Sequence, residues 1–233
     1  MPAPEHDLSA SRALNRQLVL RLKACLPMER FPPRQAAAGQ TLHSAGDALT
    51  QLPIINRGCI EAIHFLGDDG HSIIPITFNP GEMAFASALF CTTAINVDLV
   101  VSKDLEAHWV PIRDIEQCLL GSAELMVLTV RFLAQRLREV QARERDWMAR
   151  GTHDRVCAAL ARIINETELR PDGRVLIAAT HEHLSARCGV SRPKLSRELK
   201  ALERSGRLKL LRGSVEVLDP ESFRTLRWLP RQP

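Results

Sequence analysis

Residues 180–219 constrain the fold most, because they combine two short amphipathic helices, a glycine between them and a strand pair. In the first helix Leu184 and Cys188 lie four residues apart and form its inward face, and Thr180 is the candidate N-cap. Gly189 then permits the tight turn that joins two helices at a steep angle. The pattern predicts a helix-turn-helix.

The second helix carries charge on one side and leucine on the other. Ser191 is its candidate N-cap, and its predicted buried stripe consists of Leu195, Leu199 and Leu202. Polar side chains then occupy the other faces. They are Arg192, Lys194, Ser196, Arg197 and Lys200. Beyond this helix the sequence RLKLLRGSVEVLDP alternates about Gly213, which predicts a small β-hairpin wing.

Positive charge is concentrated at this end of the chain. Residues 150–233 contain 17 Lys and Arg against 10 Asp and Glu, a net charge of +7, whereas residues 1–149 contain 14 against 17, a net charge of −3. The major groove of duplex DNA admits one helix, and arginine can bind guanine through two hydrogen bonds. The sequence therefore predicts double-stranded DNA as the partner of this end. The alternative for any single cation is a solvated helix face.

The N-terminal half predicts a different architecture. Leucines recur every four residues within 8–30, which predicts a helix with Ser9 or Ser11 as its cap. Short runs rich in Ile and Val then alternate with turn signals at Gly58, at residues 68–70 and at residues 80–81. This spacing predicts an antiparallel barrel or sandwich.

Helical periodicity returns at about residue 113 and lasts to 149. An apolar seam with spacings of 4, 3, 4 and 3 lies on this helix. It consists of Met126, Val130, Leu133, Leu137 and Val140. Such a seam is typical of a dimerisation helix, and the alternative is packing on its own domain. Gly151 ends the helix, and Thr152 or Asp154 can cap the next one. We expect a sensor domain (1–112), a dimerisation helix with a hinge (113–150) and a DNA-binding domain (151–233).

Cysteine usage and hydropathy indicate a cytoplasmic protein. The six cysteines are scattered without a CxxC pair, so we expect free thiols, while a redox pair assembled in space stays open. Spanning a bilayer takes roughly 18 to 20 apolar residues, and the chain has neither such a run nor a signal core at its N-terminus.

The sequence resembles the CRP/FNR family of bacterial transcription regulators. The strongest match is VSRPKLSRELKALERSGRLK with its wing, and HSAGD (43–47) and IINRGCIEAI (54–63) look like the family's first β-roll strands. The order of the parts matches over nearly the whole chain. The resemblance implies an α+β fold with an N-terminal cyclic-nucleotide-binding-like β-roll, a long dimerisation helix and a C-terminal winged helix-turn-helix. It also implies a homodimer on a palindromic operator, no enzymatic activity, and RNA polymerase as a candidate partner.

The resemblance assigns roles to residues of the second helix. Arg192 and Arg197 match two arginines that read bases in the cyclic-AMP-binding branch, and Pro193 stands where that branch has a base-contacting glutamate. Proline cannot accept a hydrogen bond from cytosine N4, so we expect one base preference to be absent. Thr180 and His181 match the place where the first helix meets the DNA backbone. The predicted contact set is Thr180, His181, Ser191, Arg192, Pro193, Lys194, Ser196, Arg197 and Lys200.

The ligand motifs of the known branches are missing. Phe85 and Ala86 stand where cyclic-nucleotide binders have a Gly-Glu pair, and no arginine lies between Arg57 and Arg113, so we do not expect cyclic AMP. An N-terminal iron–sulfur cluster needs several cysteines, and Cys25 is the only one before residue 59.

Two readings of the sensor domain stay open. Met83, Phe85, Ala86 and Leu89 would line a pocket for a hydrophobic effector, or they are plain core. Haem also stays open. Its candidate ligands are His43, His64, His71 and His108, each of which is otherwise an ordinary surface or hydrogen-bonded histidine.

Three functions compete at this point. The first is a regulator gated by an unidentified effector or by haem. The second is a regulator that acts without a ligand or through cysteine oxidation. The third is a β-roll module of an enzyme, and the chain has neither a phosphate-binding glycine loop nor a nucleophile motif to support it. We expect no catalytic residues and no metal site.

Overall fold

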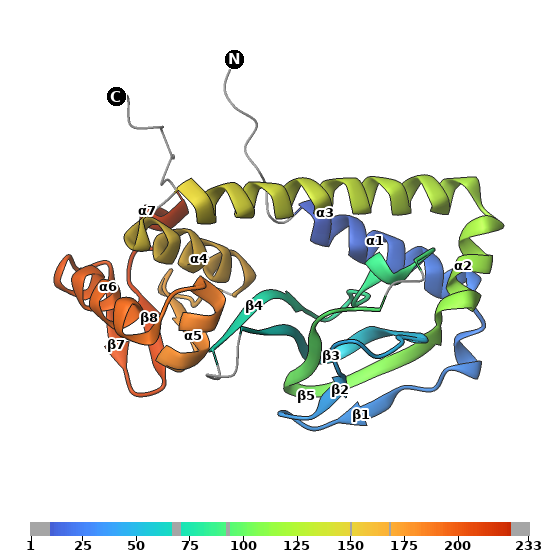
Figure 1. Ribbon diagram of the computed structural model, residues 1–233, viewed down its shortest axis with the longest axis horizontal. Helices are drawn as coiled ribbons and strands as arrows, with labels where there is room; N and C mark the ends of the chain where they lie inside the picture. The colour runs from blue at the N-terminus through green and yellow to red at the C-terminus, as the bar shows by residue number, and fades with distance from the viewer. Residues whose placement is uncertain (1–9, 67–70, 92–93, 150, 168, 225–233) are drawn as a thin grey trace, which may run out of the picture. The chain divides into compact units, whose positions relative to one another are not determined.

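The computed structural model describes residues 10–66, 71–91, 94–149, 151–167 and 169–224 (Figure 1). The chain forms two compact units. The first consists of residues 1–70 and 74–143, and the second of residues 71–73 and 144–233. The boundary between them falls inside the long helix α3 (Ala123–Ala149).

The first unit is built on one five-stranded sheet. Its strands are β1 (Arg34–Ala36), β2 (Thr41–His43), β3 (Gln51–Leu66), β4 (His71–Phe78) and β5 (Asp98–Pro111). The order is β1-β5-β3-β4, and β2 also pairs with β5. β1, β2 and β3 all run antiparallel to β5. Ile55, Ile60, Leu99, Val101 and Leu105 are buried in one core cluster on this sheet.

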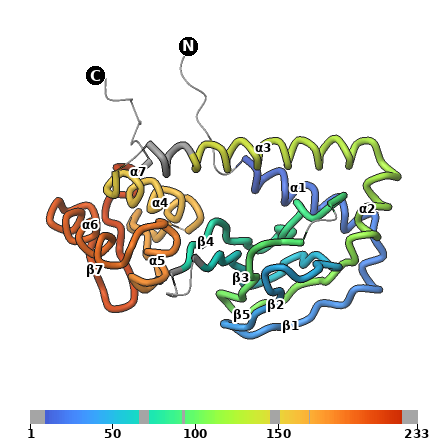
Figure 2. The backbone as a smooth tube through the Cα atoms, viewed as in Figure 1, coloured from blue at the N-terminus to red at the C-terminus, as the bar shows by residue number. Residues whose placement is uncertain are grey.

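The strands are longer and fewer than the sequence predicted. The turn expected at Gly58 is wrong, because β3 continues through it. Figure 2 traces the backbone path of β3 and β5. Gly58 has φ +84°, and a Cβ there would lie 2.2 Å from the carbonyl oxygen of Asp104 on β5. The pairing with β5 shifts register around this residue, so the glycine forms a bulge. Most of the sequence between residues 95 and 112 likewise forms one long strand, β5.

The other two turn predictions have different outcomes. The hairpin expected at residues 68–70 lies outside the described residues. The turn at residues 80–81 is confirmed, because the Glu82 N–H donates to the Asn79 carbonyl at 3.1 Å and Gly81 has φ +82°.

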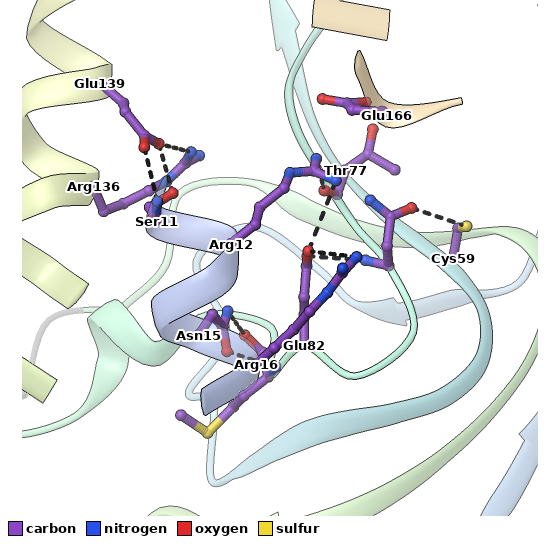
Figure 3. Close-up of polar contacts among 12 residues, drawn as sticks. Ser11, Arg12, Asn15, Arg16, Cys59, Thr77, Glu82, Arg136, Glu139 and Glu166 are labelled. Atoms are coloured by element: carbon purple, nitrogen blue, oxygen red, sulfur yellow. Dashed lines mark hydrogen bonds and ion pairs between the residues drawn. The ribbon is translucent and has the colours of Figure 1, made fainter. Parts of the chain in front are cut away.

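Helix α1 (Ala10–Cys25) confirms the predicted N-terminal helix and is held by buried polar groups (Figure 3). Ser11 lies inside the helix, where its N–H and hydroxyl donate to the Glu139 carboxylate at 3.1 and 2.6 Å. The Asn15 amide bonds the backbone of Met83 in both directions at 3.0 Å. Ser9, the other expected cap, lies outside the described residues. A short 3₁₀ turn, η1 (Met28–Arg30), follows.

The helix expected over 113–149 is two helices, α2 (Ile112–Leu120) and α3, bent by 118°. Ser122 explains the break, because its hydroxyl accepts the Leu125 N–H at 3.3 Å and caps the start of α3. Among the described residues, no single helix is long and apolar enough to cross a membrane; only this bent pair passes, by length and composition.

In the described part of the second unit, helices pack around a small sheet. The helices are α4 (Thr152–Glu166), α5 (His181–Cys188), α6 (Arg192–Arg204) and α7 (Glu221–Arg224). The strands β6 (Val175–Ile177), β7 (Leu208–Leu211) and β8 (Ser214–Val217) form an antiparallel sheet in the order β6-β8-β7. Gly151 is the N-cap of α4, with no side-chain bond, so the expected cap at Thr152 or Asp154 is wrong.

Candidate nucleic-acid interface

The turn between α5 and α6 forms as the sequence predicted. The Thr180 hydroxyl caps α5 by accepting the His183 N–H at 3.2 Å. α5 ends at Gly189, whose φ of +62° favours glycine. The Val190 N–H donates to the Ser185 carbonyl at 3.1 Å and closes the turn. The chain therefore leaves α5 and enters α6 within three residues.

The start of α6 accommodates Pro193 without loss of a helical hydrogen bond. Ser191 is the N-cap residue, with extended backbone, yet its hydroxyl makes no capping bond. A capping hydroxyl accepts from the second or third helical N–H. Pro193 occupies the second position and has no N–H, which removes one of those two donors. The predicted position of the cap is right and its predicted bond is not made.

The exposed side of α6 is cationic. Leu195, Leu199 and Leu202 are buried, as predicted. Five predicted contact residues of α6 are exposed: Arg192, Pro193, Lys194, Arg197 and Lys200. Among the described residues, none of these four cations has an ion-pair partner. An uncompensated row of cations on a rigid helix favours an anionic partner.

The remaining predicted contact residues are less exposed than those five, with the exception of Thr180. Thr180 is exposed, whereas His181, Ser191 and Ser196 are half-buried. The His181 ring nitrogen Nδ1 lies 3.1 Å from the Ser196 hydroxyl, which ties the first turn of α5 to α6. Both side chains therefore also position α6.

Three further residues position α6, and the sequence reasoning missed them. The His153 Nδ1 lies 2.8 Å from Glu198 Oε2, which joins the first turn of α4 to the flank of α6. The Arg155 guanidinium donates to the Gly189 carbonyl at the turn. Glu198 was visible as the acidic residue in a cationic run, but its partner lies 45 residues away in the sequence.

The wing is a two-residue hairpin. Leu211 pairs with Ser214, so Arg212 and Gly213 form the turn, and Gly213 has φ +72°. The Glu203 carboxylate accepts the Leu210 N–H at 2.8 Å and links the end of α6 to the wing. Arg212 and Lys209 are exposed and extend the cationic surface beyond the predicted set.

The predicted dimer seam on α3 divides into two rows. Met126 and Leu133 pack partly against the core of their own unit, and Val140 is half-buried. Val130 and Leu137 are each 58% exposed. Val127, which was not predicted, is 50% exposed and lies beside them at helical spacing. In the described part of α3, the exposed apolar row therefore consists of Val127, Val130 and Leu137, while Met126 and Leu133 face the core of their own unit.

The residues predicted to line an effector pocket are packed together. Met83, Ala86 and Leu89 are buried in the core cluster that also contains Leu18 and Leu22 of α1. Phe85 is half-buried with φ +58°, and its ring centroid lies 5.4 Å from that of Phe78. A positive φ at a bulky residue is strained and persists only where its surroundings fix it.

Two of the candidate haem ligands, His64 and His108, contact backbone carbonyl groups. His64 Nδ1 and His108 Nδ1 contact the carbonyl oxygens of Asn96 and Phe31 at 3.0 and 2.6 Å. A carbonyl oxygen only accepts, so Nδ1 is the donor in each of these two contacts. His43 is buried, and its Nε2 has no partner among the described residues. The described part of the chain contains no group of three His, Cys, Asp or Glu that could hold a metal ion.

A family model matches the unit that carries this surface. Residues 154–226 match the Crp-like helix-turn-helix domain. The match covers the turn, α6 and the wing. The second unit is therefore a winged helix-turn-helix of the Crp-like class.

Solved structures share the fold of most of the chain. A CRP/FNR-family transcriptional regulator from Thermus thermophilus has a TM-score of 0.69 at 19% identity, over 82% of this chain and 96% of that one. FixK2 from Bradyrhizobium japonicum has a TM-score of 0.71 at 14% identity, over 84% and 96%. CLP, a c-di-GMP-responsive global regulator from Xanthomonas campestris, has a TM-score of 0.68 at 17% identity, over 85% and 97%. No curated protein sequence matches the chain.

Residues 154–226 therefore form a Crp-like helix-turn-helix domain, and the chain shares the fold of CRP/FNR-family transcriptional regulators. This domain and the fold shared over most of the chain together confirm the resemblance and the α+β fold class predicted from the sequence.

Proposed function

We propose that the protein is a homodimer that recognises a palindromic DNA operator through α6 and regulates transcription in the cytoplasm by binding rather than by catalysis. The observation that carries this proposal is the cationic face of α6. Arg192, Arg197 and Lys200 are exposed there, while the leucines on the opposite side are buried. A helix fixed on one face and charged on the other is suited to the major groove.

The residues of this face have different roles. Arg192 and Arg197 bind base edges, because a guanidinium can donate two hydrogen bonds to guanine O6 and N7. Lys194 and Lys200 neutralise phosphates, which gives affinity without sequence preference. Pro193 offers no acceptor, so the cytosine contact of the cyclic-AMP branch is absent. Thr180 and His181 contact the backbone at the start of α5.

Dimerisation supplies the second recognition helix. The apolar row Val127, Val130 and Leu137 is exposed on a single chain, and burying it against a second copy removes it from water. Two copies of α6 would then read half-sites about one DNA turn apart. RNA polymerase is the expected further partner where the protein activates transcription.

The effector is a compound other than cyclic AMP. Phe85 and Ala86 replace the Gly-Glu pair, and the side chains packed in the core cluster around Met83 are apolar. A hydrophobic molecule that inserts within this cluster, between the α1 leucines and Met83, suits the apolar character of these side chains. An effector acts only through different affinity for two states of the protein.

Selection of bound duplexes from a random library tests the proposal. The expected result is a palindrome whose half-site centres lie about 10 base pairs apart. Enrichment of no sequence, or of a single asymmetric site, would contradict it. Mass spectrometry of the natively purified protein, with an absorption spectrum, identifies an apolar ligand or haem in the same preparation.

A further inference from the structure

A groove of about 380 Å³ lies between α1 and α3 in the first unit, where Figure 1 shows the two helices running alongside each other. Polar contacts join the helices at two places. The Ser11 hydroxyl donates to Glu139 at 2.6 Å, and Arg21 Nη1 lies 2.8 Å from Glu124 Oε1 in the lining of the groove. A volume of this size is in the range of small-molecule sites.

The floor of the groove is apolar and is fixed by the core. Leu125 is buried and Leu128 is half-buried, and both pack in the core cluster of the unit together with Leu18 and Leu22 of α1. Val127 is exposed at its edge. The lining of α3 runs over residues 123–131, which span about 12 Å of helix. The floor therefore suits an aliphatic chain of medium length.

The walls of the groove carry hydrogen-bond donors from both helices. Gln17 and Arg21 lie one turn apart on α1, and Arg131 faces them from α3. Arg21 is already paired with Glu124. Gln17 and Arg131 are exposed, and within the described part of the chain neither makes a hydrogen bond or an ion pair. With two arginines against one glutamate, the lining has a net positive charge.

We propose that this groove binds a small amphiphilic carboxylate, such as a medium-chain fatty acid. The aliphatic chain lies on Leu125 and Leu128, and the carboxylate accepts hydrogen bonds from the Arg131 guanidinium and the Gln17 amide. A guanidinium and a carboxylate match in geometry and charge, which gives short, charge-assisted hydrogen bonds. None of the four residues predicted to line an effector pocket lines this groove, so the site is separate from the Met83 cluster.

A second copy of the chain is the competing occupant, because Val127 belongs both to the groove and to the exposed apolar row of α3. The charge of the lining favours the carboxylate. An aliphatic row covers the floor of the groove and leaves the Arg131 guanidinium without an anion. The proposal depends on neither DNA recognition nor dimerisation, so its failure leaves the selection of an operator unaffected.

Calorimetric titration of the full-length protein with decanoate tests the charge requirement. We expect saturable binding of decanoate, and binding of decanamide, which has the same chain without the charge, that is about tenfold weaker or more. Equal affinities for the two compounds, or no saturable binding of decanoate, would overturn the proposal.

Photochemical labelling locates the bound chain. A decanoate that carries a diazirine near its end is irradiated with the protein, which is then digested and examined by mass spectrometry. We expect labels on residues 17–21 and 123–131, and unlabelled decanoate should compete with them. Labels confined to residues 83–89 would assign the carboxylate to the Met83 cluster and overturn the groove as its site.

Variants separate the donors from the space that they line. Arg131→Gln should weaken decanoate binding about fivefold or more and leave decanamide binding unchanged. Arg138→Gln is the matched control, because Arg138 is another exposed arginine of α3 without an ion pair among the described residues and lies outside the lining. An equal loss in Arg138→Gln, or none in Arg131→Gln, contradicts the assignment.

A second variant fills the groove. Gln17→Trp places a large side chain over the floor, and because Gln17 is exposed we expect the melting temperature to stay within a few degrees of the original. Decanoate and decanamide should both lose binding. If Gln17→Trp instead raises the dimer dissociation constant and the original protein binds no decanoate, a second copy fills the groove and the proposal is overturned.

Discussion

Helices α3 and α6 are both amphipathic, and they differ in what their exposed faces carry. α6 exposes Arg192, Arg197 and Lys200, whereas α3 exposes Val130 and Leu137. Each helix is anchored on its other face by buried apolar side chains. The periodicity is similar, so the chemistry of the exposed row decides the kind of partner. An exposed row of cations indicates a polyanionic partner, and an exposed row of aliphatic side chains indicates a partner with an apolar surface.

The anchoring of α6 gives the largest expected effect. Leu199→Ala removes a fully buried side chain, and we expect the second unit to lose about 2–5 kcal/mol of unfolding free energy. Calorimetry of the full chain measures this loss. Lys200→Ala, one residue further on the exposed side, is the control and should change stability by less than about 0.5 kcal/mol. Equal effects of the two would show that α6 is not anchored by its leucines.

The exposed row of α3 is the next test. Leu137→Asp places a charge in the proposed dimer seam, and we expect the dimer dissociation constant to rise roughly thirtyfold or more, as for an interface hot spot. Sedimentation equilibrium measures it. Leu120→Asp is the control, because Leu120 is 70% exposed but lies on α2 outside the row. A dimer unaffected by Leu137→Asp would move the interface elsewhere.

The sequence predicted these two helices well because their signals are local. The stripe Leu195, Leu199 and Leu202 follows from helical spacing alone, and so does the position of Pro193. The exposed apolar row on α3 was only partly predicted, since spacing does not say which of two neighbouring rows the protein's own core covers. Met126 and Leu133 turned out to contact that core.

Features that depend on a distant partner were missed or misread. Gly58 signals a positive φ, but only the nearby Asp104 carbonyl of β5 makes it a bulge instead of a turn. The bonds Ser11–Glu139 and His153–Glu198 join residues 128 and 45 positions apart. No local pattern identifies such pairs, so the polar contacts that hold α1 and α6 could not be predicted.

The His153–Glu198 pair should have a smaller effect on α6. The pair is partly exposed, so we expect His153→Ala to lower DNA affinity by up to about fivefold, corresponding to roughly 0.2–1 kcal/mol. A double-mutant cycle with Glu198→Gln, followed by fluorescence anisotropy, isolates the pair. Arg174→Ala, which disturbs a different exposed pair in the same unit, is the control. If the effects of His153→Ala and Glu198→Gln on the free energy of DNA binding simply add, the two side chains are not coupled.

The effect that is smallest at neutral pH concerns Cys188 and develops only under alkaline conditions. Burial raises the pKa of Cys188 to about 12 from an ordinary value of 9.0. Between these values the unfolded thiol loses its proton while the folded one keeps it, so the second unit should lose stability as pH rises above 9. Thermal melts at increasing pH should show a weaker decline for Cys188→Ala than for the original protein. Identical pH profiles would contradict this.

The most direct test of the account is the base preference of Arg197→Ala, measured by gel shift on the selected operator and its single-base variants. We predict that the variant stays dimeric and loses about 1–3 kcal/mol of discrimination at one symmetric position of each half-site. Lys200→Ala should instead weaken all sequences equally and reduce the salt dependence of binding. An unchanged base preference in Arg197→Ala would contradict the assignment of α6 as the helix that reads the operator.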